Sequence, residues 1–158
     1  DDVESRGLGD VYKRQSKHRY GMAADWRLVD RSINPAALGI IAAQYFKAVG
    51  IYWYDGCAIV HTDTRDAKAT WLCDAPKHYP STTYQKFILP TIRRGCTGDA
   101  NRVATKMLQR LLGLTPDGIF GEGTENALLK AQEAHGLTVD GICGPASWKA
   151  ISGASKYL

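Results

Sequence analysis

Residues 16–25 read Ser16-Lys17-His18-Arg19-Tyr20-Gly21-Met22-Ala23-Ala24-Asp25, and the predicted fold of the first half of the chain is built around them. His18 and Asp25 stand seven positions apart, and a glycine and two alanines lie between them, so little bulk separates the two side chains. Residues 23–28 are predicted to form a strand, and Gly21 is predicted to make the bend before it. Because a bend followed by a strand can direct an imidazole and a carboxylate to one point, the stretch predicts a site as well as a strand.

A third polar side chain completes a set of ligands for a metal ion. Zinc accepts imidazole nitrogen and carboxylate oxygen, and a catalytic zinc site combines three protein ligands with one water. The third ligand available in this chain is His61, in the segment Ile59-Val60-His61-Thr62-Asp63-Thr64-Arg65. The sequence therefore predicts a Zn2+ site formed by His18, Asp25 and His61.

The segment after the first strand is predicted to form a helix. Asn34 suits the N-cap and Pro35 suits the first helical position. Bulky apolar residues then recur at intervals of three and four as far as Val49, which indicates one buried face. Gly50 is predicted to end this helix.

A hairpin is predicted to follow the helix. It consists of a strand at 51–54, a tight Asp55-Gly56 turn and a returning strand at 57–63. Alternate residues of a strand share one face, so His61 and Asp63 point the same way. The hairpin therefore returns His61 to the side of the first strand.

These residues form the pattern Ser-x-His-x-x-Gly-x-Ala-x-Asp followed by His-x-Asp, which resembles the zinc D-Ala-D-Ala carboxypeptidase and endopeptidase family of bacterial cell-wall peptidases. The resemblance covers about residues 16–73. It implies that His18, Asp25 and His61 hold zinc and that Trp71 caps the end of the sheet. The fold it implies is α+β, a small antiparallel sheet with a helix.

Asp63 and Arg65 are the residues expected to assist catalysis. Many members of that family carry an acidic general base three positions before the last ligand histidine, where this chain has Ala58. Asp63 is the nearest carboxylate on the same strand face, where it either accepts a proton from water or hydrogen-bonds a ligand imidazole; the second role is favoured. Arg65 either binds a substrate carboxylate through two hydrogen bonds or is a surface charge, and Ser16 either binds substrate or caps a turn.

The composition narrows the class of partner. With 44% hydrophobic and 23% charged residues, the chain is typical of soluble proteins, and no apolar run reaches the roughly 20 residues of a membrane span. A net charge of +4 suits an anionic bacterial wall polymer, although a charge of that size is also unremarkable. The basic residues are scattered and not interleaved with aromatic residues, so a nucleic-acid partner is not expected.

The four cysteines, Cys57, Cys73, Cys96 and Cys143, form no Cys-x-x-Cys pair, which argues against a zinc knuckle or a thioredoxin-like motif. Cys57 and Cys73 could form a disulfide in an oxidising compartment, and the redox compartment stays open. Cys57 is predicted to fill a buried space rather than to bind a metal beside His61.

Residues 1–15 are interpreted as a segment that is not native to the protein. They contain neither the apolar stretch of a signal peptide nor a helical period. Asp10-Val11-Tyr12-Lys13-Arg14-Gln15 can be back-translated as GATGTGTATAAGAGACAG, which resembles the transposon-end adapter used for sequencing libraries. We therefore expect the natural N-terminal part of the first domain, and any signal sequence before it, to be missing; a natural polar tail is the alternative.

Residues 75–92 are predicted to link a first domain at 16–74 to a second at 93–153. Three prolines and a run of serine and threonine are typical of a loop without a core of its own. Residues 84–89 are the part expected to pack on one of the domains, and His78 is expected to be exposed to solvent.

The second domain is predicted to contain three helices joined by two copies of one turn. Helices are expected at 101–112, 124–135 and 145–151. The turns are Asp117-Gly118-Ile119-Phe120-Gly121 and Asp140-Gly141-Ile142-Cys143-Gly144, an internal repeat in which Asp-Gly makes the turn and Ile fills the core.

The repeat and its helices resemble the three-helix peptidoglycan-binding module, from about Arg93 to Ile151. Most residues that carry the resemblance are expected to be structural. The residues considered for the ligand groove are Phe120, Asn126 and Gln132, and each is expected to be scaffold rather than contact.

The order of zinc site, linker and wall-binding module predicts a peptidoglycan peptidase. The resemblance implies hydrolysis of a stem-peptide amide bond, either the terminal D-Ala-D-Ala bond or an internal L-Ala-D-Glu bond. Its partner would be the murein of the bacterial wall, and the protein would be a monomeric endolysin released at host lysis or a secreted wall hydrolase located at the cell wall. The alternative is a wall-binding protein that lacks catalytic activity, which Ala58 at the usual base position favours.

Overall fold

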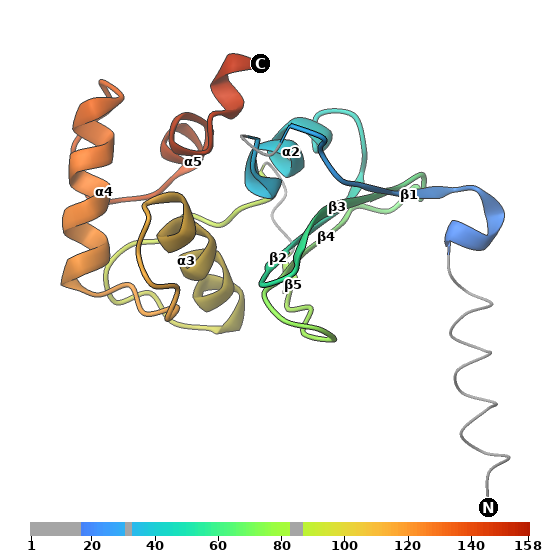
Figure 1. The fold of residues 1–158 in the computed structure, drawn as a ribbon, viewed down its shortest axis with the longest axis horizontal. Helices are drawn as coiled ribbons and strands as arrows, with labels where there is room; N and C mark the ends of the chain where they lie inside the picture. Colours follow the sequence, from blue (N-terminus) through green and yellow to red (C-terminus); the bar gives the residue numbers. More distant parts are fainter. Residues whose placement is uncertain (1–16, 31–32, 83–86) are drawn as a thin grey trace, which may run out of the picture.

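The computed structural model describes residues 17–30, 33–82 and 87–158, so the interpretations of residues 1–15 and of Ser16 lie outside the described residues. The described chain has an α+β fold in which a small sheet lies beside a group of helices (Figure 1). The elements in chain order are η1 Lys17–Tyr20, β1 Ala23–Trp26, α2 Pro35–Ala42, β2 Ala48–Tyr54, β3 Cys57–Asp63, β4 Ala69–Cys73, β5 Ser81–Thr82, α3 Asp99–Leu111, α4 Glu122–Ala134, α5 Pro145–Ser152 and η2 Ala154–Lys156.

The sheet has the order β1-β3-β2-β4-β5, and it is mixed. The predicted hairpin is confirmed, because β2 and β3 pair antiparallel around the Asp55-Gly56 turn. The expectation of a purely antiparallel sheet is wrong, since β4 pairs parallel with β2. One edge of β3 pairs with β2 and the other pairs with β1, so the next strand, β4, has no free edge of β3 to join. β4 therefore pairs with β2 and runs parallel to it.

The predicted helix begins where expected but ends earlier. The Ala37 amide donates to Asn34 Oδ1 at 2.9 Å, and Pro35 is the first helical residue. The helix then ends at Ala42, whereas the prediction carried it to Val49. Val49 and its neighbours form β2 instead, since a strand between β3 and β4 is hydrogen-bonded on both edges and buries Val49 completely.

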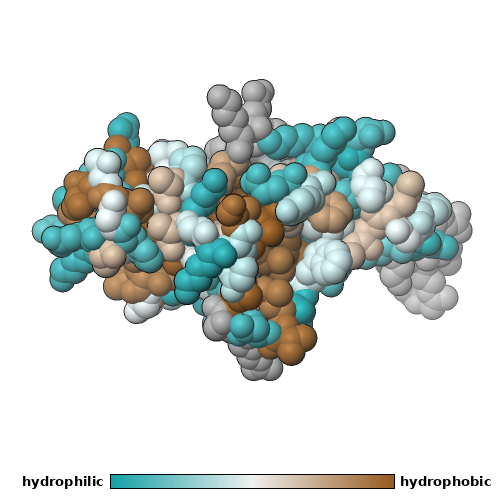
Figure 2. All heavy atoms as spheres, turned by 90° about the horizontal axis from the view of Figure 1, so that it is seen from above, coloured by the Kyte–Doolittle hydropathy of each residue, from teal (hydrophilic) through white to brown (hydrophobic). Residues whose placement is uncertain are grey.

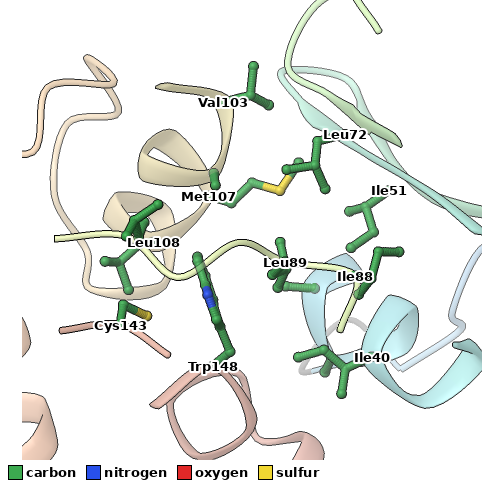
Figure 3. Packing of buried hydrophobic residues seen from close by; sticks show 14 of the residues in the cluster. Ile40, Ile51, Leu72, Ile88, Leu89, Val103, Met107, Leu108, Cys143 and Trp148 are labelled. Carbon is green, nitrogen blue, oxygen red and sulfur yellow. The ribbon is translucent and has the colours of Figure 1, made fainter. Parts of the chain in front are cut away.

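The helices α2 and α3 pack on one face of the sheet, and no α-helix of the described chain covers the other face. Side chains of the strands meet side chains of both helices there, as Figure 3 shows for Leu72, Ile51, Met107 and Ile40. All four are fully buried. The covered face therefore forms the core, and the opposite face is available for a site.

The predicted linker takes part in this core. Ile88, Leu89 and Ile92 are at most 2% exposed, and Figure 3 shows Leu89 between the sheet and Trp148 of α5. Trp148 Nε1 donates to the Pro90 carbonyl at 2.7 Å, and the Ile92 and Cys143 backbones exchange two hydrogen bonds. These residues were predicted to be a loop without a core of its own. They are instead buried in a core that is shared by the two parts that they connect.

Further contacts join the sheet and the helical part. Asn34 Nδ2 donates to the Ser152 carbonyl at 2.8 Å, and Arg110 lies 3.3 Å from the Asp55 carboxylate. Seen from above, hydrophobic residues reach the surface over the middle of the molecule and over the end that carries the helical part (Figure 2). The two parts are therefore packed together rather than tethered.

The doubled turn forms two equivalent hydrogen-bonded units. In the first, Gln109 Nε2 donates to Asp117 Oδ1 and to the Ile119 carbonyl, while Gln109 Oε1 accepts from the Gly118 amide. Gln132 makes the same bonds to Asp140, Ile142 and Gly141. Gln132 is thus fully engaged as scaffold, as expected.

The residue that fills the core in each turn differs from the prediction. Ile119 is 69% exposed, whereas Phe120 is 4% exposed and Cys143 is fully buried. The expectation that each Ile fills the core is therefore wrong for Ile119. The Asp117 carboxylate accepts from the Ile119 amide at 2.8 Å, and this turn directs the following side chain inward.

His78, which was expected to be exposed to solvent, has a side chain that is 35% exposed and that also has a partner at each ring nitrogen. Its Nδ1 lies 2.5 Å from Asp74 Oδ1 and its Nε2 lies 2.8 Å from Asp99 Oδ2, so it bridges the end of β4 and the start of α3. Lys106 and Arg102 of α3 also face Asp74. Hydrogen bonds to Asp74 and Asp99 raise the pKa of His78 above its usual value.

All four cysteines are free thiols in the structure, including Cys57 and Cys73. No helix within the described ranges is both long and apolar enough to cross a bilayer.

The shared core predicts that the sheet and the helical part unfold together. Trp148→Ala is expected to lower the free energy of unfolding by about 3–5 kcal/mol, the usual loss for a buried aromatic side chain. The other three tryptophans, Trp26, Trp53 and Trp71, all lie in the sheet, so their fluorescence in urea reports on the sheet alone. An unchanged urea midpoint for that fluorescence would show that the two parts are independent, and Tyr157→Ala, at a residue 54% exposed, is the matched control.

The bridge at His78 predicts a pH-dependent stability. A raised folded pKa stabilises the protein fully below the unfolded value of about 6.5, and this contribution disappears as the pH rises through the folded pKa. His78→Gln is therefore expected to cost up to about 1 kcal/mol near pH 6 and less in alkaline solution. Urea denaturation across this range measures the difference. His135→Gln, at an exposed position after α4, is expected to show no such trend, and a pH-independent cost at His78 would contradict the assignment.

Candidate metal centre

The candidate site lies on the open face of the sheet, where one row of residues crosses the strands. Asp25 of β1 pairs with His61 of β3, His61 pairs with Gly50 of β2, and Gly50 pairs with Trp71 of β4. Paired residues point to the same face, so Asp25, His61 and Trp71 lie side by side. The prediction that His61 returns beside Asp25 is confirmed.

His18 reaches this row from outside the sheet. It belongs to the short 3-10 helix η1, and the bend at Gly21, with φ of 64°, turns the chain into β1. The Met22 amide donates to the Lys17 carbonyl at 3.0 Å and closes this bend. Because Gly21 adopts a left-handed conformation that glycine accepts at little cost, the bend predicted at this position also directs His18 toward Asp25.

The three predicted ligands converge. His61 Nδ1 lies 2.9 Å from Asp25 Oδ1 and 3.1 Å from His18 Nε2, and His18 Nε2 lies 3.5 Å from Asp25 Oδ1. All three donor atoms lie within 4.8 Å of one another. The His18 and Asp25 side chains are 41% and 48% exposed, while that of His61 is 12% exposed. The three residues are therefore accessible from solvent, and His61 is the least exposed of them.

The other ring nitrogen of His61 faces Asp63. Its Nε2 lies 3.3 Å from Asp63 Oδ2, and the Asp63 side chain is fully buried. Burial alone would raise the pKa of Asp63, but hydrogen bonds from Arg65 and His61 outweigh it and lower the pKa to about 2. An ionised carboxylate only accepts hydrogen bonds, so His61 Nε2 is the donor to Asp63, and Nδ1 is the ring nitrogen that faces His18 and Asp25.

This donor set fits zinc. Two imidazole nitrogens and one carboxylate oxygen are the ligands of an open, catalytic zinc site. A ligand imidazole that donates its second N–H to a buried carboxylate is also the usual outer arrangement of such a site. A cation between the three donor atoms would satisfy lone pairs that otherwise compete for one hydrogen.

Arg65 holds Asp63 in place. Its Nε donates to Asp63 Oδ1 at 2.7 Å, its Nη2 donates to Asp63 Oδ2, and the Arg65 backbone amide donates to Asp63 Oδ1 at 3.0 Å. The guanidinium carbon lies 5.8 Å from the centre of the Trp71 ring. Its side chain is 36% exposed, so Arg65 is partly accessible to solvent.

Trp71 lies over Gly50 instead of capping the end of the sheet. A Cβ placed on Gly50 would lie 2.2 Å from Trp71 Cε2, so the indole occupies the space that any other residue at this position would fill. The indole centre lies 5.2 Å from that of the His61 ring. The sequence predicted that Gly50 ends a helix and that Trp71 caps the sheet. Neither position was foreseen, because both depend on the parallel pairing of β2 and β4.

Ala58 lies away from the cluster. Ala58 pairs with Trp53 and stands three positions before His61, so its side chain is on the opposite face of the sheet. There it lines a cavity of about 700 Å³ together with Leu38 and Pro35. An acidic side chain at position 58 of this strand would therefore point away from the three donor atoms.

The residues considered for a ligand groove lie in the helical part. Phe120 and Gln132 are buried there and Asn126 is exposed, so Asn126 is the one of the three that a ligand can reach directly.

Comparison with known proteins identifies the helical part. Residues 97–151 match the family described as putative peptidoglycan binding domain, and they include α3, α4 and α5. No curated protein and no solved structure matches the chain. The match supports association with the bacterial cell wall and does not extend to the sheet that carries the cluster.

Close packing at Gly50 predicts a cost for any side chain there. Gly50→Ala is expected to displace the Trp71 indole and to lower the free energy of unfolding by about 1–3 kcal/mol, the range for overpacking. NMR of the indole N–H groups is expected to show a shift for Trp71. Gly123→Ala, where an added methyl meets no atom, is the control, and equal stability of the two variants would contradict the packing.

Proposed function

We propose that this chain is a zinc-dependent peptidase of bacterial peptidoglycan, in which His18, Asp25 and His61 hold the metal. The observation that carries the proposal is the convergence of their three donor atoms within 4.8 Å on an open sheet face. The matched domain at 97–151 supports a wall polymer as the substrate. The bond cleaved would be a stem-peptide amide, either terminal D-Ala-D-Ala or internal L-Ala-D-Glu.

The ligand residues would divide the work according to their surroundings. His61 is the best-held ligand, because Asp63 binds its outer nitrogen and β3 is paired on both edges. Asp25 contributes the negative charge, and His18 completes the set from η1. Bound zinc would polarise a substrate carbonyl and lower the pKa of a water molecule to about 7.

Asp63 is better suited to orient His61 than to act as a base. A general base works best when its pKa lies near the working pH, whereas hydrogen bonding lowers the pKa of Asp63 to about 2. Its oxygens are also occupied by Arg65 and His61. We therefore assign Asp63 a positioning role, which was the role that the sequence favoured.

Arg65 is suited to bind a carboxylate of the substrate. Its guanidinium is held by Asp63 and by Trp71, so it is oriented before any ligand arrives. The partly exposed side chain keeps N–H groups available to an anion. A D-Ala carboxylate or the acidic side of D-Glu would supply such an anion.

The wall-binding domain would hold the site close to its polymer. Attachment raises the effective concentration of substrate at the second site when the geometry permits both contacts. In this chain the two parts share a core, so the distance and direction from wall contact to metal centre would be constant. Such a protein would work as an endolysin or a secreted hydrolase at the cell wall.

A catalytically inactive wall-binding protein is the second candidate. The shortage of a free carboxylate favours it, because Asp63 is the one acidic residue of β3 and its oxygens are occupied by Arg65 and His61. In that case the zinc group would stabilise the sheet, and the domain at 97–151 would provide the function.

Zinc binding and peptide release together test the proposal. The chain is expected to bind about one Zn2+, measured by equilibrium dialysis with metal analysis. Asp25→Asn and His61→Ala are expected to abolish that binding, and Asp63→Asn is expected to weaken it about 10–100-fold. Release of new amino groups from purified walls is expected for the zinc-loaded chain and not after chelation.

His135→Ala is the matched control, since His135 is exposed and distant in sequence from the cluster. Failure to bind zinc would overturn the proposal. Zinc binding without amino-group release, together with sedimentation on walls, would favour the inactive binder.

A further inference from the structure

Tyr52 places a hydroxyl group beside the candidate metal centre. It lies on β2, two residues from Gly50, and pairs with Ile59, so its side chain is on the face that carries His61. Trp71 Nε1 donates to the Tyr52 hydroxyl at 2.9 Å. The position that a Cβ of Gly50 would take lies 2.3 Å from the same Trp71 Nε1, so the hydroxyl lies near Gly50, the cross-strand neighbour of His61.

The hydrogen of this hydroxyl is available to a ligand. An indole N–H can only donate, so the phenol oxygen of Tyr52 is the acceptor in its bond with Trp71. Within the described part of the chain, no acceptor lies within hydrogen-bonding distance for the phenol hydrogen. Burial raises the pKa of Tyr52 to about 12, and the phenol therefore remains a neutral donor at any working pH.

Two aromatic rings hold the Tyr52 phenol in place on this face of the sheet. Tyr79 packs edge-on against Tyr52 with centres 5.9 Å apart, and it is 47% exposed. On the other side, Trp71 separates Tyr52 from His61 and supports both. The charge of Asp25 contributes to the raised pKa of Tyr52, which is consistent with a hydroxyl near the three ligands.

We propose that Tyr52 binds the substrate peptide by donating a hydrogen bond to one of its acceptor oxygens, next to the His18, Asp25 and His61 group. The inference rests on the proposed function and deepens it, since it names a residue that positions the peptide. The acceptor is either a backbone carbonyl or the terminal carboxylate. Tyr52 and Arg65 flank Trp71, so the two would hold different oxygens of one peptide.

Tyr52→Phe tests this inference because it keeps the ring and removes the hydroxyl. The probe is the soluble stem peptide L-Ala-D-Glu-L-Lys-D-Ala-D-Ala, and its affinity for the zinc-loaded, full chain is measured as the Michaelis constant for amino-group release, or as the dissociation constant by calorimetry where no release occurs. The variant is expected to bind about tenfold more weakly, the change that one lost hydrogen bond produces. Its zinc content and sedimentation on walls are expected to match those of the unmodified chain, and its urea midpoint is expected to fall only by the small amount that the lost Trp71 hydrogen bond explains.

A second probe, the same peptide with a C-terminal amide, distinguishes the two oxygens. A loss confined to the free acid assigns the carboxylate, and an equal loss for both peptides assigns a backbone carbonyl. Tyr45→Phe, at a residue 79% exposed after α2, is the matched control and is expected to bind both probes normally.

Equal affinity of Tyr52→Phe and the unmodified chain would overturn the inference and leave the proposed function intact. Weaker binding accompanied by a lower urea midpoint and lost zinc would show that Tyr52 only supports Trp71, and would also overturn it. If the unmodified chain binds zinc but neither peptide, both the inference and the proposed peptidase function fail.

Discussion

The antiparallel register between β1, β3 and β2 is the constraint on which the site depends. It is set at one end by the Asp55-Gly56 turn, where Gly56 has φ of 79° and Tyr54 pairs with Cys57. A slip of one residue would move His61 to the face covered by helices, because side chains alternate along a strand. The same slip would separate His61 from Asp25 and from the space over Gly50. One hairpin therefore determines the geometry of the three ligands, the hydrogen bond between Asp63 and His61, and the space that Trp71 occupies.

The two faces of the sheet have different roles for a physical reason. Val49, Ile51, Val60 and Leu72 are fully buried on one face, where α2 and α3 cover them. The residues on the other face that form the candidate site are polar and aromatic and several of them are partly exposed to solvent, so that face does not need a cover of helices. Helices of the wall-binding domain thus complete the core of the sheet. The part that matches the putative peptidoglycan binding domain also acts as a structural layer for the candidate site.

Local features were predictable from the sequence, whereas the extent of some elements was not. The Asn34 cap, the hairpin turn and the doubled Asp-Gly turn depend on neighbouring residues, and all three are confirmed. The end of α2 was missed because residues 43–49 have a helical pattern that pairing within the sheet outweighs. The partners of His78 were not foreseen because Asp99 comes from a distant segment, and Ile119 was misjudged because its exposure depends on the exact direction of a turn.

The sequence by itself determined which residues could form the candidate metal centre and that His61 and Asp63 share a strand face. It did so because the alternation of side chains and the bend at Gly21 are local properties of the backbone. Only the tertiary structure decided that β4 lies parallel to β2, that Trp71 fills the space above Gly50, and that Tyr52 receives its hydrogen bond there. These contacts join segments about 20 residues apart through strand order, which depends on how the whole sheet buries one face against the helices.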